Sequence, residues 1–342
     1  KASIRLKNVN DKQGAELSFF VQDAKASNLE LKKANGRIRF DDVSTAWPQD
    51  VAIDVDRLRA GAAMTVEKGA LSLSAGAGSS YKLSLAAKGQ AIRPVALKAD
   101  ADLSGLGNAY PSLRNIKATA TIGKSQMNLS GAIEQNDVNV TLSSKSIRLS
   151  DLPVSLPDSL SKAEISGNVT MTGLPSRPVT NAHILAQGLA SGPYKDLRLT
   201  ADARHEGDLA KLTFIGRGSG IKTMSGTAEL PLTFALDPFS ANLNFDGPLM
   251  AHLKSDLDAG ALAALALNPL QRVSGKLSVS ADLGGTINRP NVEGEIVLKD
   301  GTFADSQAGI KLESIQLASS LANDTFILKS LSATDGESGA LT

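Results

Sequence analysis

Apolar and polar residues alternate with a period of two along most of this chain. Leu71, Leu73 and Ala75 alternate with serine, for example, and Leu277, Val279, Ala281 and Leu283 repeat the pattern far downstream. Residues two apart in a strand point to the same side of a sheet. Each segment therefore presents one aliphatic face and one polar face, and the pattern predicts an all-β protein.

Glycine and proline divide the alternating runs into short segments. Proline residues at 94, 178 and 290 and six dipeptides predict turns: Asn35-Gly36, Ser130-Gly131, Ser166-Gly167, Asp246-Gly247, Asp300-Gly301 and Asp335-Gly336. Pro231 falls inside an alternating run and predicts an edge or a bulge there, since proline cannot donate to a ladder. The chain lacks the repeated helical segments that parallel βαβ units need, which favours a meander.

One segment departs from the alternation. Residues 255–270, "SDLDAGALAALALNPL", have an Asp-rich start, an Ala/Leu body and an Asn-Pro stop, and they predict a short helix over 256–267. This helix is apolar nearly all round, so we expect it to be buried. It would either plug one end of a sandwich or barrel, or lie across the apolar face of an open sheet.

Two stretches of the chain are similar to each other. "SGNVTMTGLPSRP" from Ser166 and "SGKLSVSADLGGTINRP" from Ser274 share a Ser-Gly, an alternating strand, a glycine turn and an Arg-Pro. Repetition of this kind predicts an array of stacked β units. We divide the chain into a repetitive β-sheet region, 1–160, and a second region, 161–342, within one continuous sheet.

Composition excludes several classes of function. Lys and Arg number 36 against 35 Asp and Glu, so no basic field attracts nucleic acid. The chain has no cysteine, which removes disulfides and thiolate chemistry. It starts and ends within its own strand pattern, so we expect a segment of a longer protein, with any membrane anchor outside it.

Catalytic motifs are missing from the sequence. The three histidines, His183, His205 and His252, are far apart, and we interpret them as surface or strand residues. "GRGSGIKT" from Gly216 lacks the spacing of a phosphate loop and predicts a hairpin turn. Asp256 and Asp258 are interpreted as helix-start residues. We expect no enzyme activity, no metal and no cofactor.

The aliphatic faces can be interpreted in two ways. In a sandwich each would pack against a second sheet and need no further explanation. In an open or folded-over sheet it would stay as a continuous apolar surface, which normally marks a binding site.

The stretch from Leu257 onward carries an ordered set of motifs after its Leu/Ala-rich segment: Ser274-Gly275, Gly284-Gly285, Pro290, Gly294, Asp300-Gly301 and Phe303. This set resembles the C-terminal region of the TamB family (translocation and assembly module), within the AsmA-like superfamily of bridge-type lipid transfer proteins. The resemblance implies a long sheet folded into a groove, called a β-taco, that is similar to a β-solenoid.

The same resemblance implies a function. It implies non-enzymatic transport of phospholipids between the inner and outer membranes, in the periplasm, by a protein anchored through an N-terminal segment that is not in this sequence. The implied partners are phospholipid acyl chains and a TamA-like outer-membrane barrel, the latter through parts of the protein outside this chain. Two alternatives stay open: a scaffold or chaperone for outer-membrane proteins that pairs strand edges, and a structural β-solenoid with a closed core.

The residues expected to line the groove are the in-phase apolar residues of the second region. They are Leu197, Leu199, Leu230, Leu232, Phe234, Leu243, Phe245, Leu277, Val279, Ile296, Leu298, Leu312 and Leu317.

Overall fold

Strands make up almost all of the computed structural model. It describes residues 2–9, 12–26, 29–44, 47–60, 64–76, 80–91, 93–106, 111–152, 162–191, 194–260, 271–323 and 325–342. The 22 strands belong to an antiparallel sheet, which confirms the all-β prediction. In the described ranges, no helix is long and apolar enough to cross a membrane.

Two compact units divide the chain. Unit 1 comprises residues 1–155 and 168–175, and unit 2 comprises residues 156–167 and 176–342. Strand β11 (Glu164–Gly173) contributes residues to both.

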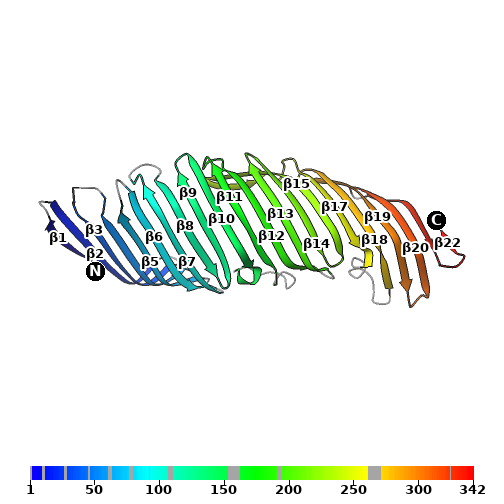
Figure 1. Ribbon diagram of the computed structural model, residues 1–342, viewed down its shortest axis with the longest axis horizontal. Helices are drawn as coiled ribbons and strands as arrows, with labels where there is room; N and C mark the ends of the chain where they lie inside the picture. The colour runs from blue at the N-terminus through cyan, green and yellow to red at the C-terminus, as the bar shows by residue number, and fades with distance from the viewer. Residues whose placement is uncertain are drawn as a thin grey trace. The chain divides into compact units, whose positions relative to one another are not determined.

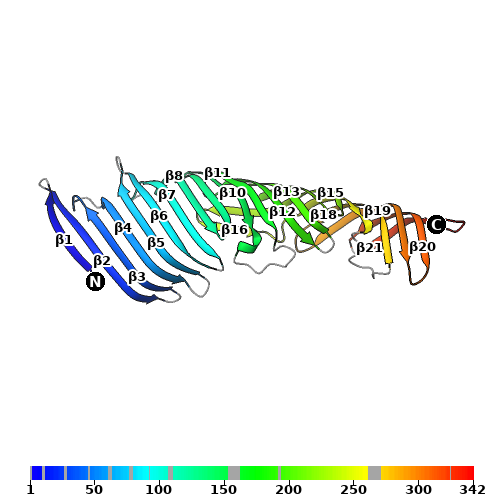
Figure 2. The ribbon, with the colours of Figure 1, turned by 60° about the horizontal axis from the view of Figure 1, so that its bottom comes forward.

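Unit 1 is a meander in which each strand pairs with the next one along the chain, from β1 to β10. Figures 1 and 2 show its strands β2 to β7 lying side by side. A 3-10 helix, η1, follows β10 at Leu149–Asp151. The strands are β1 (Ala2–Val9), β2 (Lys12–Ala26), β3 (Leu29–Phe40), β4 (Asp50–Ala60), β5 (Met64–Ala75), β6 (Ser80–Gln90), β7 (Pro94–Ser104), β8 (Ser112–Ile122), β9 (Ser125–Glu134) and β10 (Asp137–Arg148).

Unit 2 continues the antiparallel pattern with one interruption. β12 to β15 pair in chain order, β15 pairs with both β16 and β17, and β17 to β22 again pair in order. The strands are β12 (Val179–Ser191), β13 (Tyr194–Glu206), β14 (Leu209–Gly218), β15 (Ile221–Leu236), β16 (Phe239–Leu243), β17 (Met250–Asp258), β18 (Gln271–Gly285), β19 (Pro290–Asp305), β20 (Ile310–Ala322), β21 (Thr325–Thr334) and β22 (Ala340–Leu341).

Pro231 marks the interruption. Up to Pro231, β15 pairs with β14 on one side and, over Ile221–Glu229, with β17 on the other. From Leu232 onward it pairs with β16 instead. Proline offers no N–H to a ladder, so the strand changes partners at the position where the sequence predicts an edge or bulge.

Most of the glycine dipeptides lie within strands, so their interpretation as turns is wrong. Asn35-Gly36 is in β3, Ser130-Gly131 in β9, Ser166-Gly167 in β11 and Asp300-Gly301 in β19. At Gly131, φ is +136° and a Cβ would collide with the carbonyl oxygen of Asn139 on β10. Glycine is therefore used here for a close approach between two strands. Asp246-Gly247 and Asp335-Gly336 do fall in connections.

The expected helix over 256–267 does not begin at Asp256, because residues 256–258 belong to β17. Asp256 instead accepts hydrogen bonds from neighbouring strands. Asp258 ends the strand, and its Oδ1 accepts a hydrogen bond of 2.8 Å from the backbone N–H of Gly260. Residues 261–267 lie outside the described residues.

Two glycines of β18 provide a matched test of whether glycine is needed where two strands approach closely, as at Gly131. Gly275 has φ +135°, and a Cβ on it would lie 2.8 Å from Gly301 Cα, whereas a Cβ on Gly284 would meet open space. We expect Gly275→Ala to lower the free energy of unfolding by about 1–3 kcal/mol. Gly284→Ala should change it by less than about 0.5 kcal/mol. Urea unfolding followed by circular dichroism measures both, and equal effects would contradict the assignment.

Candidate functional site: an uncovered apolar face

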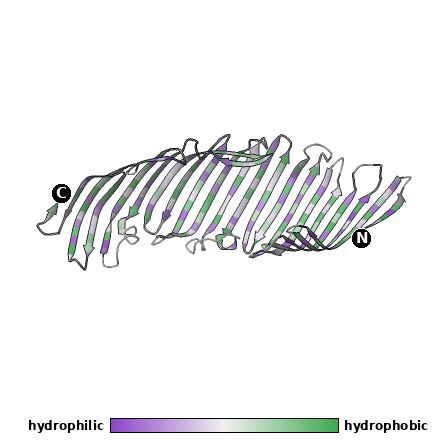
Figure 3. Ribbon diagram, turned by 180° about the vertical axis from the view of Figure 1, so that it is seen from behind, coloured by the Kyte–Doolittle hydropathy of each residue, from purple (hydrophilic) through white to green (hydrophobic). Residues whose placement is uncertain are grey.

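The strand register of unit 2 places aliphatic residues on one side of the sheet. Leu257, Leu277, Leu298, Leu317 and Leu331 are successive cross-strand partners from β17 to β21. Directly opposed residues of antiparallel strands point to the same side, so these five leucines form one row. We call this side the apolar face of unit 2. Figure 3 shows the underlying alternation of hydrophobic and hydrophilic residues along the strands.

A second row extends this face over eight strands, from β13 to β21. The directly paired residues that form it are Leu199, Gly216, Met224, Ser255, Val279, Ile296, Ser319 and Leu328. A third row includes Ala203, Leu212, Ala228, Ala251, Leu283 and Val292. The face therefore consists almost entirely of aliphatic side chains and glycine.

Twelve of the thirteen residues predicted from the sequence lie on strands, and register brings most of them together. Leu197, Leu199, Leu230, Leu277, Val279, Ile296, Leu298, Leu312 and Leu317 lie on the strands that form this face. Leu232, Phe234 and Leu243 lie on the β15–β16 hairpin, where Leu232 pairs with Leu243. Phe245 follows β16 in a connection and is 52% exposed.

The aliphatic residues of the apolar face are half-buried, and the β15–β16 hairpin lies against part of this face at His205. The twelve strand residues are half-buried, and none reaches the burial of a core side chain. Buried hydrophobic residues of unit 2 are few among the described ones, namely Ala163, Ala186, Ala259, Ile315 and Ala333. A sandwich would bury its inner residues against a second sheet. The described part of unit 2 does not form such a sandwich, so its aliphatic face is available for binding.

Large side chains on the apolar face lie over glycines of the neighbouring strand. Gly226 is the direct partner of Phe214, and a Cβ on Gly226 would lie 2.6 Å from the Phe214 ring. Met224 covers Gly216 in the same way, at 2.6 Å. The bulky side chain occupies the space that a side chain at the glycine would fill. Each pair therefore protrudes little from the apolar face.

The opposite side of unit 2 carries charged pairs between adjacent strands. Lys211 and Glu229 are direct partners with an N–O distance of 2.6 Å. His183 and His252 contact the carboxylates of Asp202 and Asp282 at 2.6 and 2.7 Å. Such exposed pairs contribute little stability, but they identify this side as the solvated polar face.

Asp256 is a carboxylate of the polar face that accepts hydrogen bonds from two neighbouring strands. It accepts hydrogen bonds from Ser278 at 2.8 Å and Thr223 at 3.1 Å. These two bonds lower the pKa of Asp256 from its ordinary value, and the nearby Lys254 and Lys222 lower it further. Asp256 is therefore ionised at neutral pH.

The β15–β16 hairpin is fastened to the apolar side of β13 through His205, which is 6% exposed. The Nε2–H of His205 donates to the carbonyl oxygen of Leu232 at 3.0 Å. The imidazole also meets the ring of Phe234 edge-on, with the centroids 6.2 Å apart. The hairpin base is tied to the β18–β19 connection, where Asn288 donates from Nδ2 to Asp246 at 2.8 Å.

The interpretation of His205 as a surface or strand residue thus misses its role in holding the hairpin. Its Nδ1 is buried without a hydrogen-bond partner among the described residues, as is Oγ1 of its cross-strand partner Thr180. No short sequence signal could reveal this contact, since Leu232 follows His205 by more than twenty residues.

We expect His205→Leu to loosen the hairpin. The substitution leaves the Leu232 carbonyl without its donor, at a cost of about 1–3 kcal/mol. Hydrogen exchange measured by mass spectrometry should be faster in peptides that cover residues 232–243. His252→Leu is the control, because His252 is exposed on the polar face. Equal exchange in the wild type and His205→Leu would show that the contact does not hold the hairpin.

Unit 1 has an apolar face of its own, which the sequence-based set of groove residues omits. One row of direct partners is Ile4, Leu17, Ile38, Val51, Leu73, Leu83 and Ala101. The alternation at Leu71, Leu73, Leu83 and Leu85 was the available signal. Phe19 lies over its partner Gly36 here, as Phe214 lies over Gly226 in unit 2.

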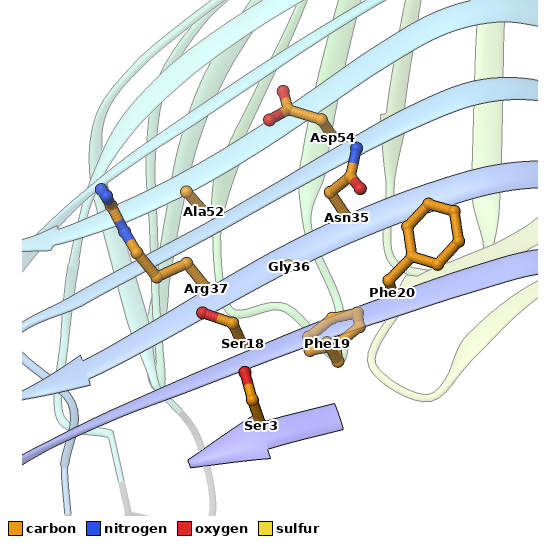
Figure 4. A pocket seen from close by; sticks show the side chains of 9 residues that line it. All are labelled: Ser3, Ser18, Phe19, Phe20, Asn35, Gly36, Arg37, Ala52 and Asp54. Atoms are coloured by element: carbon orange, nitrogen blue, oxygen red, sulfur yellow. The ribbon is translucent and has the colours of Figure 1, made fainter. Parts of the chain in front are cut away.

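A hollow of about 800 Å³ lies near the same strands of unit 1 (Figure 4). Its lining mixes polar and apolar groups and comes from β1 to β4: Ser3, Ser18, Phe19, Phe20, Asn35, Gly36, Arg37, Ala52 and Asp54. Arg37 is paired with Asp50 at 3.3 Å. The lining contains no histidine that could activate a serine, so its geometry does not form a nucleophile and base pair.

Comparison with known proteins gives no match. No family model, curated protein or solved structure is significantly similar to this chain. Within the described residues, no group of three or more His, Cys, Asp or Glu side chains is placed to hold a metal ion. The apolar faces are therefore the features of the described chain that indicate a function.

Proposed function

We propose that this chain binds phospholipid acyl chains on its apolar faces and transports them, without enzymatic chemistry, between the inner and outer membranes. The observation that carries the proposal is the half-buried state of the aliphatic residues on the apolar face of unit 2. A soluble protein rarely leaves so large an apolar surface without a ligand or partner.

The chemistry of the face suits an acyl chain. Its rows offer methyl and methylene groups, and very few polar atoms that could select a hydrogen-bonding ligand. Burial contributes about 0.8 kcal/mol per methylene group. An acyl chain lying across several strands would gain this contribution at each of its carbons, with little dependence on its exact position.

The pairing of large side chains with glycines supports movement of the ligand along the face. Phe214 and Met224 lie over Gly226 and Gly216 instead of adding a ridge to the surface. A face of low relief holds an acyl chain without a deep pocket, so the barrier between adjacent binding positions stays small.

The proposal also gives the protein a cellular location and a protein partner. The resemblance to the TamB family favours a periplasmic protein, anchored to the inner membrane by a segment that precedes this sequence. A TamA-like outer-membrane barrel would be contacted by parts of the protein outside this chain. The alternative of a scaffold for outer-membrane protein assembly would use the strand edges and leave the apolar face without a ligand.

Val279→Asp tests the proposal, with Ser280→Asp as the matched control. Both place one carboxylate on β18, but Val279 is on the apolar face and Ser280 is on the polar face opposite Lys254. Native mass spectrometry of the purified chain should find phospholipid on the wild type and on Ser280→Asp. We expect Val279→Asp to lose most of it, because an acyl chain cannot solvate the buried charge.

Circular dichroism before the lipid measurement separates binding from folding. Val279 is half-buried, so its replacement removes only about 1 kcal/mol of burial and the chain should stay folded. Unfolding of Val279→Asp alone would indicate a closed core. A lipid-free wild type, or equal lipid on both variants, would contradict transport on this face and favour the scaffold.

A further inference from the structure

Several cations on the outer surface of unit 2 form a salt bridge with a carboxylate. Lys211 pairs with Glu229, Arg204 with Glu206, Lys276 with Asp300 and Lys329 with Glu295, at N–O distances of 2.6–3.0 Å. Lys211 and Glu229 follow the usual rule that opposite charges face each other across strands, whereas Arg204 and Glu206 lie on the same strand.

Four cations on neighbouring strands depart from this rule. Arg198 on β13, Arg217 on β14, Lys222 on β15 and Lys254 on β17 are exposed, and none forms a salt bridge to another described residue. We call these four residues the basic patch. Arg198 and Arg217 are direct cross-strand partners, an arrangement that repels and that folding alone does not favour.

Three acidic residues lie beside the basic patch: Asp256, Asp258, whose N–H donates to Gly220 in the β14–β15 turn, and Asp196, two residues before Arg198 on β13. Asp256 is attracted to Lys222 and Lys254, but its oxygens already accept hydrogen bonds from Ser278 and Thr223. Among the described residues, none of these three carboxylates forms a salt bridge with the four cations, which outnumber them. The basic patch therefore carries an excess of positive charge, although the whole chain is nearly neutral at +1.

Three residues of the basic patch, Arg198, Arg217 and Lys222, lie at the margin of the apolar face, whereas Lys254 lies in the middle of β17. Lys222 and Arg217 flank the β14–β15 turn, where Gly218 pairs with Ile221. Arg198 immediately precedes Leu199, and Ile221 pairs with Leu257, so apolar-face residues alternate with those of the basic patch. Arginine and lysine side chains are long enough to reach the edge of the sheet from the polar side.

We propose that the basic patch binds the phosphate of an anionic phospholipid headgroup at this margin, while the acyl chains lie on the apolar face. The inference rests on the proposed function and adds the place where the headgroup is held. Guanidinium groups bind phosphate oxygens through paired N–H donors, and two adjacent arginines provide two such forks. A bound phosphate would also relieve the repulsion between Arg198 and Arg217.

Vesicle flotation tests the assignment. The vesicles are phosphatidylcholine alone or phosphatidylcholine mixed with phosphatidylglycerol. The double variant Arg198→Gln/Arg217→Gln is compared with Arg204→Gln/Lys211→Gln, which removes the same charge from cations that already have partners. Each lost cation should weaken binding to the mixed vesicles about 5-fold, hence about 25-fold for the first variant. The second variant should bind nearly as the wild type does.

Three outcomes would overturn the inference. Equal weakening of both double variants would show that total charge decides binding. Equal binding of the wild type to both vesicles would show that the anionic headgroup is not recognised. Displacement by inorganic phosphate at the concentration of the phosphatidylglycerol headgroups would identify a site for free anions.

Native mass spectrometry on the same proteins separates this inference from the proposed function. If the wild type carries phospholipid but flotation is insensitive to Arg198 and Arg217, the headgroup assignment fails and acyl-chain binding stands. If the wild type carries none, the proposed function fails, whatever the flotation shows.

Discussion

The register of the antiparallel ladder is the constraint on which the rest of this structure depends. Leu257, Leu277, Leu298 and Leu317 form a row only because each strand pairs so that residues of the right parity oppose one another. A shift by one residue in any strand would turn its apolar side chains to the polar face. Bulges such as the one at Asp300, where φ is +54°, let a long strand bend without losing that parity.

Glycine has a different purpose here from the one it has in a hairpin turn. At Gly131 and Gly275 it allows the backbones of adjacent strands to approach, and at Gly226 it makes room for the ring of Phe214. The strands can thus be long and the apolar face low in relief. Both consequences follow from the absence of a Cβ, and both suit a surface along which an acyl chain could move.

The two sides of unit 2 differ in how their side chains find partners. On the polar face, cross-strand pairs such as Lys211 and Glu229 satisfy charges locally. On the apolar face, most of the described aliphatic residues are left half-buried, and the β15–β16 hairpin packs against part of the face. The β15–β16 hairpin departs from this two-sided arrangement. It begins after Pro231, where β15 stops pairing with β14, and His205 holds the hairpin in place.

Alternation by itself determined the all-β class and the side of the sheet to which residues such as Leu199, Val279 and Ile296 belong, because parity within a strand is a local property. Proline chemistry predicted an edge or a bulge at Pro231, where β15 changes partner, and the glycine-rich motif from Gly216 predicted the hairpin turn. Alternation did not reveal the roles of Gly36 and Gly131. A dipeptide that ends in glycine occurs both in turns and at positions where a neighbouring strand or side chain comes close. Asp256 shows the same limit: a sequence typical of a helix start is held in β17 by Ser278 and Thr223. Only the tertiary structure decided that the aliphatic residues of the apolar face stay half-buried and that Arg198 meets Arg217, because burial and cross-strand neighbours depend on residues far apart in the chain.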